Sequence, residues 1–320
     1  MNQPSWLVDD LLRVEQLLLA TAGASGHPMV SEPAVHLIKA GGKRLRPALV
    51  LLASRFGTPG TRASDLAAAA VELIHLATLY HDDVVDETDT RRGVPTVHAK
   101  WGTEVAVLTG DYLFAQGCAL GADAGGDIPS ILARALGEVC EGQIMETEAL
   151  HHPRRSPTQY LATIKMKTAA LFRASCAMGA SSAGAPSEHR AALAAYGENL
   201  GIAFQIVDDL LDLVGDPQIT GKLPGTDLKE GVFTAPVLIA CEREPHLIKL
   251  LSDGVHDLDS ILPILESSGA LGAAWNDAKE RALAAGAALT TLPTDDARDA
   301  LETILDGVLA QAPETVTTRL

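Results

Sequence analysis

The stretch VELIHLATLYHDDVVDE, residues 71–87, contains the two features that decide the fold of this chain. It continues a run from Leu66 to Tyr80 in which apolar residues recur at the i, i+3, i+4, i+7 spacing of an amphipathic helix. The spacing predicts a long helix with one face buried in a core. The helix ends in a group of three carboxylates, which are Asp82, Asp83 and Asp86.

Helical spacing recurs in nearly every other segment of the 320 residues, and Gly- or Pro-containing breaks separate the segments. Aromatic residues make up only 4% of the chain and hydrophobic residues 47%, with Ala and Leu recurring throughout, which favours helices over sheets. We find no strict alternation, no Asn-Gly hairpin signal and no internal repeat. The sequence therefore predicts an all-α fold of ten or more helices in a single domain spanning residues 1–320.

Charge and cysteine content exclude several classes of protein. The formal net charge is −16, which argues against a nucleic-acid binder. The four cysteines form no Cys-x-x-Cys pair, which argues against a structural zinc site or a disulfide framework and indicates a reducing, cytoplasmic location. No uncharged apolar run reaches about 18 residues, so we expect no transmembrane segment.

A second acidic group follows another apolar helical run, GIAFQIVDDLLDLVGD, residues 201–216. Like charges on one helical face cost roughly 0.2–0.5 kcal/mol per pair, and acids late in a helix also oppose its dipole. One such group is most often a solvated helix end, but two copies in apolar helices point to function. Facing carboxylates suit Mg²⁺, which usually binds through one or two carboxylates and substrate phosphates. The second group consists of Asp208, Asp209 and Asp212.

Basic residues gather at a few places in this acidic chain. The segment GGKRLRP, residues 41–47, places three cations in four positions beside two glycines, and Arg91-Arg92 follows the first acidic group. An isolated basic dipeptide is most often a solvated surface feature, and a histidine such as His75 is as often a core residue. Together with two carboxylate groups, these residues indicate an anion site.

With these acidic and basic segments, the chain resembles the trans-isoprenyl diphosphate synthases, also called polyprenyl synthetases. The resemblance covers most of the chain and rests on six segments: GGKRLRP at 41–47, ELIH to HDDVVDETDTRRGVPTVH at 72–98, GDYLFAQ at 110–116, EGQ at 141–143, KTAALF at 167–172, and FQIVDDLLD to GTDLKEG at 204–231. It implies an isoprenoid-synthase-type helical bundle around a deep central cavity, and a homodimer. It also implies a Mg²⁺-dependent prenyltransferase that joins isopentenyl diphosphate to an allylic diphosphate.

The resemblance also implies a role for individual residues. Three Mg²⁺ ions and the allylic diphosphate would be held by Asp82, Asp83, Asp86 and Asp208, with Asp209 and Asp212 in support. The same diphosphate would contact Arg91, Lys167 and Lys222. Isopentenyl diphosphate would bind Lys43, Arg46, His75 and Arg92. Thr168 and Gln205 would line the reacting centre beside Lys167.

Small residues just upstream of the first acidic group bear on product length. Ala77 and Thr78 lie five and four residues before Asp82, where short-chain relatives carry aromatic blockers, and Ile74 is the next bulky residue. Five helical residues span about 7.5 Å. We therefore expect a product longer than farnesyl diphosphate; the alternative is that Ala77 only packs against a neighbouring helix.

A departure from the family pattern and three rival functions remain open, one of them an acidic helical scaffold that would not depend on magnesium. Val232 stands where many relatives carry a lysine, so one diphosphate contact is either absent or supplied by Lys229. A class I terpene cyclase would share the acids but would not need a second diphosphate site. A non-catalytic subunit of a hetero-oligomeric synthase would tend to lose acids that this chain keeps.

Overall fold

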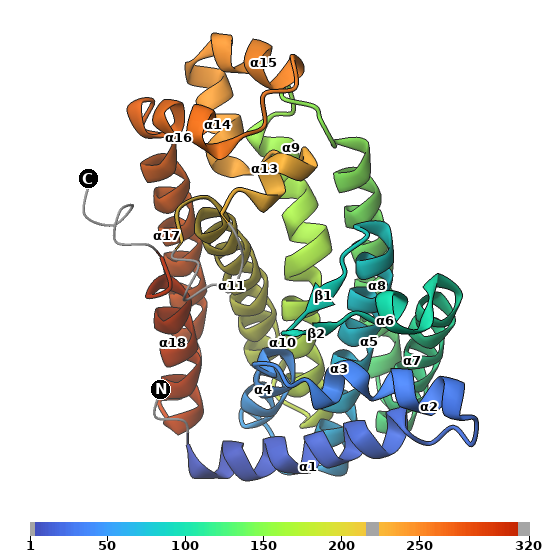
Figure 1. Cartoon of the computed structure of the whole chain (residues 1–320). Helices are drawn as coiled ribbons and strands as arrows, with labels where there is room; N and C mark the ends of the chain where they lie inside the picture. Colours follow the sequence, from blue (N-terminus) through green and yellow to red (C-terminus); the bar gives the residue numbers. More distant parts are fainter. Residues whose placement is uncertain (1–3, 216–223, 313–320) are drawn as a thin grey trace.

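The computed structural model describes residues 4–215 and 224–312, and the described chain is a bundle of helices (Figure 1). This confirms the all-α prediction. The elements of the first half are α1 (Ser5–Ala22), α2 (Pro28–Ala34), α3 (His36–Lys39), α4 (Leu45–Ser54), α5 (Arg62–Val85), β1 (Thr90–Arg91), β2 (Val94–Pro95), α6 (Val97–Trp101), α7 (Thr103–Ala124) and α8 (Ile128–Glu148).

The second half of the chain is also helical where it is described. Its elements are α9 (Pro157–Ile164), the π-helical turn η1 (Lys165–Ala169), α10 (Ala170–Ser182), α11 (Ser187–Val214), α13 (Thr226–Glu230), α14 (Ala235–Arg243), α15 (Pro245–Ser252), α16 (Leu258–Ser267), α17 (Ala270–Leu289) and α18 (Asp296–Leu309).

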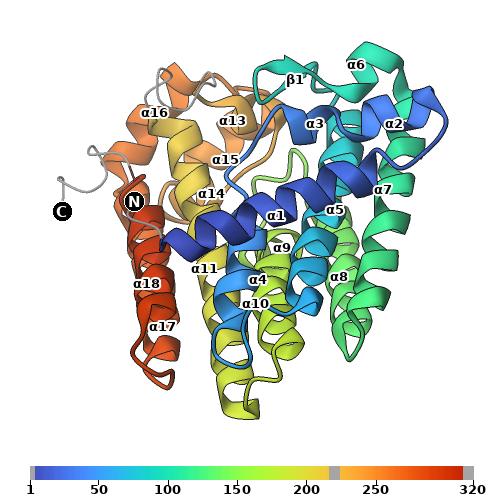
Figure 2. The ribbon, with the colours of Figure 1, turned by 90° about the horizontal axis from the view of Figure 1, so that it is seen from below.

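Helix α5 forms the centre of the core, as its apolar spacing predicts. The Thr61 side chain caps its first turn by accepting a hydrogen bond from the backbone N–H of Ser64 at 3.1 Å. The helix packs against α4, α7 and α10, while α1 runs across the bundle and contacts α4 and α5 (Figures 1 and 2). Because α5 is enclosed in this way, its C-terminal aspartates are held in a fixed place.

A small hairpin is one part of the fold that the sequence does not predict. β1 and β2 pair antiparallel for two residues each, with Thr90 opposite Pro95. The turn between them is formed by Arg92 and Gly93, whose φ angles are 53° and 76°. Positive φ at both positions is the geometry of a tight two-residue hairpin turn. Strands of two residues are too short to show an alternating pattern.

Two helices, α5 and α7, are long and apolar enough to cross a membrane by length and composition alone. Most of the apolar part of α5 is buried inside the bundle, as in the core helix of a globular protein. The four cysteines are all free: Cys118 and Cys140 are exposed, and Cys176 and Cys241 are buried. The prediction of no disulfide framework is therefore consistent with the structure.

Candidate active site

A cavity of about 180 Å³ lies where residues of α8, α9, η1, α11 and the segment around α13 meet the end of α5. Both acidic groups contribute to its wall, the first through Asp86 and the second through Asp208 and Asp209. Residues that are 122 positions apart in the sequence therefore line one site. The remaining wall is formed by Glu146, Arg155, Tyr160, Thr163, Ile164, Lys167, Thr168, Gln205, Asp227, Glu230, Val232, Phe233 and Thr234.

The three aspartates of the first group differ in their surroundings. Asp82 is half-buried, and burial raises its pKa to about 6, while the charge of Lys167 opposes this shift. Asp86 is exposed at the C-cap of α5. Asp83 is only 1% exposed, its Oδ1 accepts a hydrogen bond from Arg91 Nε at 2.5 Å, and it is not among the described residues that line the cavity.

The second group also separates into distinct environments. Asp209 is 3% exposed, and its two carboxylate oxygens accept hydrogen bonds from the Tyr160 hydroxyl and from Gln205 Nε2. Burial raises the pKa of Asp209 to about 7, although both hydrogen bonds favour its charged form. Asp208 is exposed and faces the cavity. Asp212 accepts a hydrogen bond from the backbone N–H of Asp227 at 3.2 Å and so joins α11 to α13.

A π-helical turn carries two of the three residues expected at the reacting centre, Lys167 and Thr168. Residues 165–169 form η1, although the periodicity from Pro157 to Gly179 predicts one continuous α-helix. Single π-helical turns are frequent at functional sites because the extra residue shifts the side chains that follow it. Thr168 lies on this turn, and its hydroxyl donates to Gln205 Oε1 at 2.8 Å.

Two glycines allow neighbouring helices to approach this turn. A methyl group on Gly142 of α8 would overlap the backbone of Lys167. A methyl group on Gly201 of α11 would lie 2.7 Å from the Cα of Ala169. The turn is therefore clamped on two sides, and Lys167 reaches Glu146 of α8, to which its Nζ donates a hydrogen bond.

A separate cluster of cations forms around His75. Arg46 lies with its guanidinium carbon 4.9 Å from the centre of the Phe172 ring, and its buried Nε has no partner among the described residues. Arg92 donates from Nη1 to the carbonyl oxygens of Leu37 (3.1 Å) and Gly41. Burial lowers the pKa of Arg46 to about 10. Burial, together with the neighbouring arginines, lowers the pKa of His75 well below its usual value.

The other predicted cations have different positions. Arg91 pairs with Asp83, as described above. Lys43 is exposed, and its Nζ donates to Gln311 Oε1 at 2.9 Å. Arg44 pairs with Glu15 at 2.7 Å and with the buried Glu72 at 3.1 Å. Lys222 lies outside the described residues.

The residues expected to set product length lie in the core. Ile74 and Ala77 are fully buried in α5, and Thr78 is half-buried with its hydroxyl bonded to the carbonyl of His75 at 2.7 Å. Ile74 packs against Gly117 of α7, where a methyl group would lie 3.0 Å from the Ile74 side chain. The first bulky side chain upstream of Ala77 on this face is therefore fixed between two helices.

Within the described residues, no three His, Cys, Asp or Glu side chains already lie close enough together to hold a metal ion. The chemistry of the donor set still fits a hard divalent cation. Asp86 and Asp208 offer carboxylate oxygens to one cavity, and Mg²⁺ that also binds a substrate phosphate needs only one or two of them. Burial is the main cause of the raised pKa of Asp82, and the charge of Asp86 adds to it.

Sequence reasoning missed several wall residues. Glu146 follows Gly142 by four residues on α8, so it lies one turn away on the same helical face as the EGQ segment, and that spacing could have identified it. Arg155 comes from the α8–α9 connection and Tyr160 from α9, where the local pattern gives no signal. Their approach to Asp209 depends on tertiary packing.

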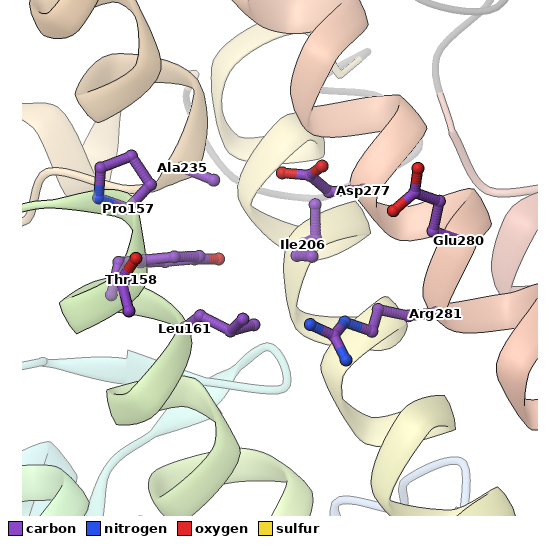
Figure 3. A pocket seen from close by; sticks show the side chains of 9 residues that line it. Pro157, Thr158, Leu161, Ile206, Ala235, Asp277, Glu280 and Arg281 are labelled. Carbon is purple, nitrogen blue, oxygen red and sulfur yellow. The ribbon is translucent and has the colours of Figure 1, made fainter.

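Tyr160 also borders a second cavity of about 180 Å³ between α9, α11, α14 and α17. Figure 3 shows Leu161 of α9 facing Ile206 of α11, with Arg281 of α17 reaching toward Leu161. No residue predicted as functional lines this second cavity within the described chain. Tyr160 therefore separates the candidate active site from a space without assigned chemistry.

Comparison with known proteins gives a consistent result. Residues 27–261 match the family model described as polyprenyl synthetase. The chain is 44% identical over 241 residues to heptaprenyl diphosphate synthase component 2 of Geobacillus stearothermophilus, covering 75% of each chain.

Solved structures of similar proteins cover nearly the whole chain. A decaprenyl diphosphate synthase from Rhodobacter capsulatus has a TM-score of 0.90 and 38% identity, covering 96% of this chain and 98% of that one. A polyprenyl synthase from Caulobacter crescentus, complexed with calcium and isoprenyl diphosphate, has a TM-score of 0.88 and 37% identity, covering 94% of each chain. On this evidence, the protein is a member of the polyprenyl synthetase family.

Proposed function

We propose that this protein condenses isopentenyl diphosphate with an allylic diphosphate, head to tail and in trans, to make a polyprenyl diphosphate longer than farnesyl diphosphate. One observation carries the proposal: Asp86 of the first acidic group and Asp208 and Asp209 of the second line a single cavity, and a separate cation cluster lies around His75. A reaction between two diphosphates requires two such anion sites. The similar proteins are named as heptaprenyl and decaprenyl synthases, which supports a long product.

The polyprenyl synthetase family depends on magnesium. We assign three Mg²⁺ ions to Asp82, Asp86 and Asp208, with Asp83, Asp209 and Asp212 holding the ends of α5 and α11 in place. When bound, the metal would neutralise the allylic diphosphate and so make it a better leaving group. Both carboxylate oxygens of Asp209 accept hydrogen bonds, from Tyr160 and from Gln205. These bonds favour a structural role for Asp209 over direct metal binding.

The residues around the cavity have distinct tasks in this reaction. Lys167 keeps its charge, because Glu146 and Asp82 raise its pKa against the effect of burial, and it can therefore meet the departing diphosphate. The allylic carbon–oxygen bond breaks, and the double bond of isopentenyl diphosphate attacks the resulting carbocation. Thr168 and Gln205 hold each other beside this centre. The proton that is then lost passes to the released diphosphate, so no strong protein base is needed.

Isopentenyl diphosphate is assigned to the cation cluster. Arg46, with a buried Nε that lacks a partner among the described residues, and Arg92 provide positive charge. His75 stays neutral between them and can donate one hydrogen bond without adding repulsion. Lys43 is exposed and lies three residues before Arg46 in the sequence. From the surface, its ammonium group can contact the diphosphate of the bound ligand.

We further assign the whole sequence, residues 1–320, to one synthase domain that works in the cytoplasm as a homodimer. Four free cysteines support a reducing compartment. Exposed apolar side chains on α7 and α8, including Leu108 (67%) and Ile144 (60%), support a covered face.

A second assembly is supported by one observation. The relative from Geobacillus stearothermophilus is named as component 2 of a heptaprenyl diphosphate synthase, which suggests a synthase that needs a partner subunit. The expected sign of that alternative is no turnover by the purified chain alone and turnover after a second protein is added.

The deciding assay incubates the purified chain with labelled isopentenyl diphosphate, several allylic primers and Mg²⁺, with and without EDTA. We expect chain-elongated products that disappear with EDTA, and chromatography of these products gives their length. Cyclised hydrocarbon without incorporation of label would instead indicate a class I terpene cyclase. Absence of turnover under every condition, including with added partner, would contradict the proposal.

A further inference from the structure

Arg155 brings a second positive charge into the active-site cavity. It lies in the connection between α8 and α9, and among the described residues that line the cavity only Arg155 and Lys167 are lysine or arginine. The same wall carries six acidic residues: Asp86, Glu146, Asp208, Asp209, Asp227 and Glu230. A substrate with two phosphates needs cations in this wall, so each one has a large effect on binding.

The two cations differ in their partners. Lys167 forms an ion pair with Glu146. Arg155 is half-buried, and no carboxylate of the described residues lies within ion-pair distance of its guanidinium. Burial lowers its pKa, and the nearby charge of Glu146 only partly opposes that shift. A partly desolvated guanidinium without a carboxylate partner is suited to bind an anionic ligand.

The side chain of Arg155 is also held in a defined position. Its Nη2 donates to Thr163 Oγ1 and to the carbonyl oxygen of Gln159, the latter at 3.3 Å. Its guanidinium carbon lies 5.8 Å from the centre of the Tyr160 ring. Nε and Nη1 have no hydrogen-bond acceptor within residues 4–215 and 224–312, so they remain available to a ligand.

Tyr160 connects Arg155 to the second acidic group. Its hydroxyl donates to Asp209, and its ring supports the guanidinium of Arg155. Val232, which also lines the cavity, is apolar, while Lys229 is exposed and is not among the described lining residues. A cation on this part of the wall therefore comes from Arg155 rather than from the segment after α13.

We propose that Arg155 binds the diphosphate of the allylic substrate through Nε and Nη1, beside Asp208 and Asp209. This inference rests on the proposed condensation reaction. It adds to that function a substrate-binding residue from the α8–α9 connection, which no sequence motif of the chain includes.

The neighbouring Arg154 provides a matched control. Arg154 is exposed and lines an adjoining open groove with Arg155 and Thr163, but it does not line the active-site cavity. The test compares the wild-type chain with the variants Arg155→Gln, Arg155→Lys and Arg154→Gln. For each protein, kcat and KM are measured separately for farnesyl diphosphate and for isopentenyl diphosphate with Mg²⁺, together with inhibition by inorganic diphosphate and the Tm.

For Arg155→Gln we expect the KM for farnesyl diphosphate and the inhibition constant of inorganic diphosphate to rise about 10- to 100-fold, the usual effect of losing a hydrogen bond between two charged groups. The KM for isopentenyl diphosphate should change by less than about twofold. Arg155→Lys should recover part of the loss, since lysine keeps the charge but not the fork of donors. Arg154→Gln should behave like the wild type.

Two results would overturn the inference. One is an Arg155→Gln variant whose KM for farnesyl diphosphate matches that of Arg154→Gln. The other is an equal rise in both KM values with a lowered Tm, which would mean that Arg155 only anchors α9. Failure of the proposed function is distinguishable, because the wild-type chain itself would then show no condensation.

Discussion

His75 shows how single residues in this site are set by their neighbours. Its imidazole lies half-buried beside Arg46 and Arg92, and burial, followed by repulsion from these cations, lowers its pKa well below 6.5. Because its pKa is lowered in the folded chain, His75 is protonated in the unfolded chain at pH values where it stays neutral in the folded chain. The folded state therefore loses stability as the pH falls below the pKa of the unfolded residue.

The corresponding prediction concerns His75→Gln. Between pH 7 and pH 5, the wild-type chain should lose stability relative to the variant by roughly 1–2 kcal/mol, because each pH unit below 6.5 costs up to about 1.4 kcal/mol. Urea unfolding of both proteins at several pH values measures this difference. Parallel pH profiles would contradict it, and substitution of the exposed His152 by glutamine controls for a general effect.

Ala77 allows a test of product length at the same scale. Phenylalanine at this fully buried position, five residues before Asp82, would add a large ring to the interior, and we expect it to shorten the main product. Chromatography of the extracted products measures the change. The Tm should fall slightly, because overpacking costs about 1–3 kcal/mol. Ala133→Phe, on the exposed face of α8, is the control, and an unchanged product distribution in Ala77→Phe would exclude this role.

At the scale of elements, the site depends on the close packing of η1 between α8 and α11. Gly142 and Gly201 have no Cβ atom, and this leaves the space that the turn occupies. The position of Lys167 and Thr168 therefore depends on these two glycines. The π-helical turn itself could not be predicted from sequence, since its residues fit an α-helical pattern equally well. The acidic groups and the ends of α5 and α11, in contrast, follow directly from apolar spacing and from the charges that interrupt it.

Two glycines of α8 test this packing. Gly142→Ala should destabilise the chain by several kcal/mol or displace η1, with loss of condensation activity, because the methyl group overlaps the Lys167 backbone. Gly137→Ala meets no atom within 4 Å and should stabilise the helix by about 0.5–1 kcal/mol. Thermal unfolding and the condensation assay compare them. Equal behaviour of the two variants would show that the turn is not clamped.

At the scale of the whole molecule, the exposed apolar side chains of α7 and α8 allow a test of the proposed homodimer. Leu108 is 67% exposed on α7, and a charge there should disrupt a dimer that covers this face. We expect Leu108→Glu to be monomeric by light scattering while the wild type is dimeric. Leu283→Glu, at a 73% exposed position on α17, should stay dimeric. A dimeric Leu108→Glu variant would place the interface elsewhere.

Global packing also explains which parts of the site sequence could not reveal. Tyr160 reaches Asp209, and Arg155 lies over the Tyr160 ring, only because α9 packs against α11, and no local spacing encodes that contact. The hairpin after α5 was missed for a related reason: two-residue strands are too short for a periodic pattern. The helices could be predicted from local spacing, but the long-range contacts between them, which bring the wall residues together, could not.

The distribution of the four thiols has a practical consequence. Cys118 and Cys140 are open to solvent, whereas Cys176 and Cys241 are enclosed, and burial raises the pKa of Cys241 to about 11. A thiolate-specific dye should therefore modify the outer pair quickly in native protein and the inner pair only as the chain opens. The number of labelled thiols over time would then report the rate at which the core unfolds, without an engineered reporter group.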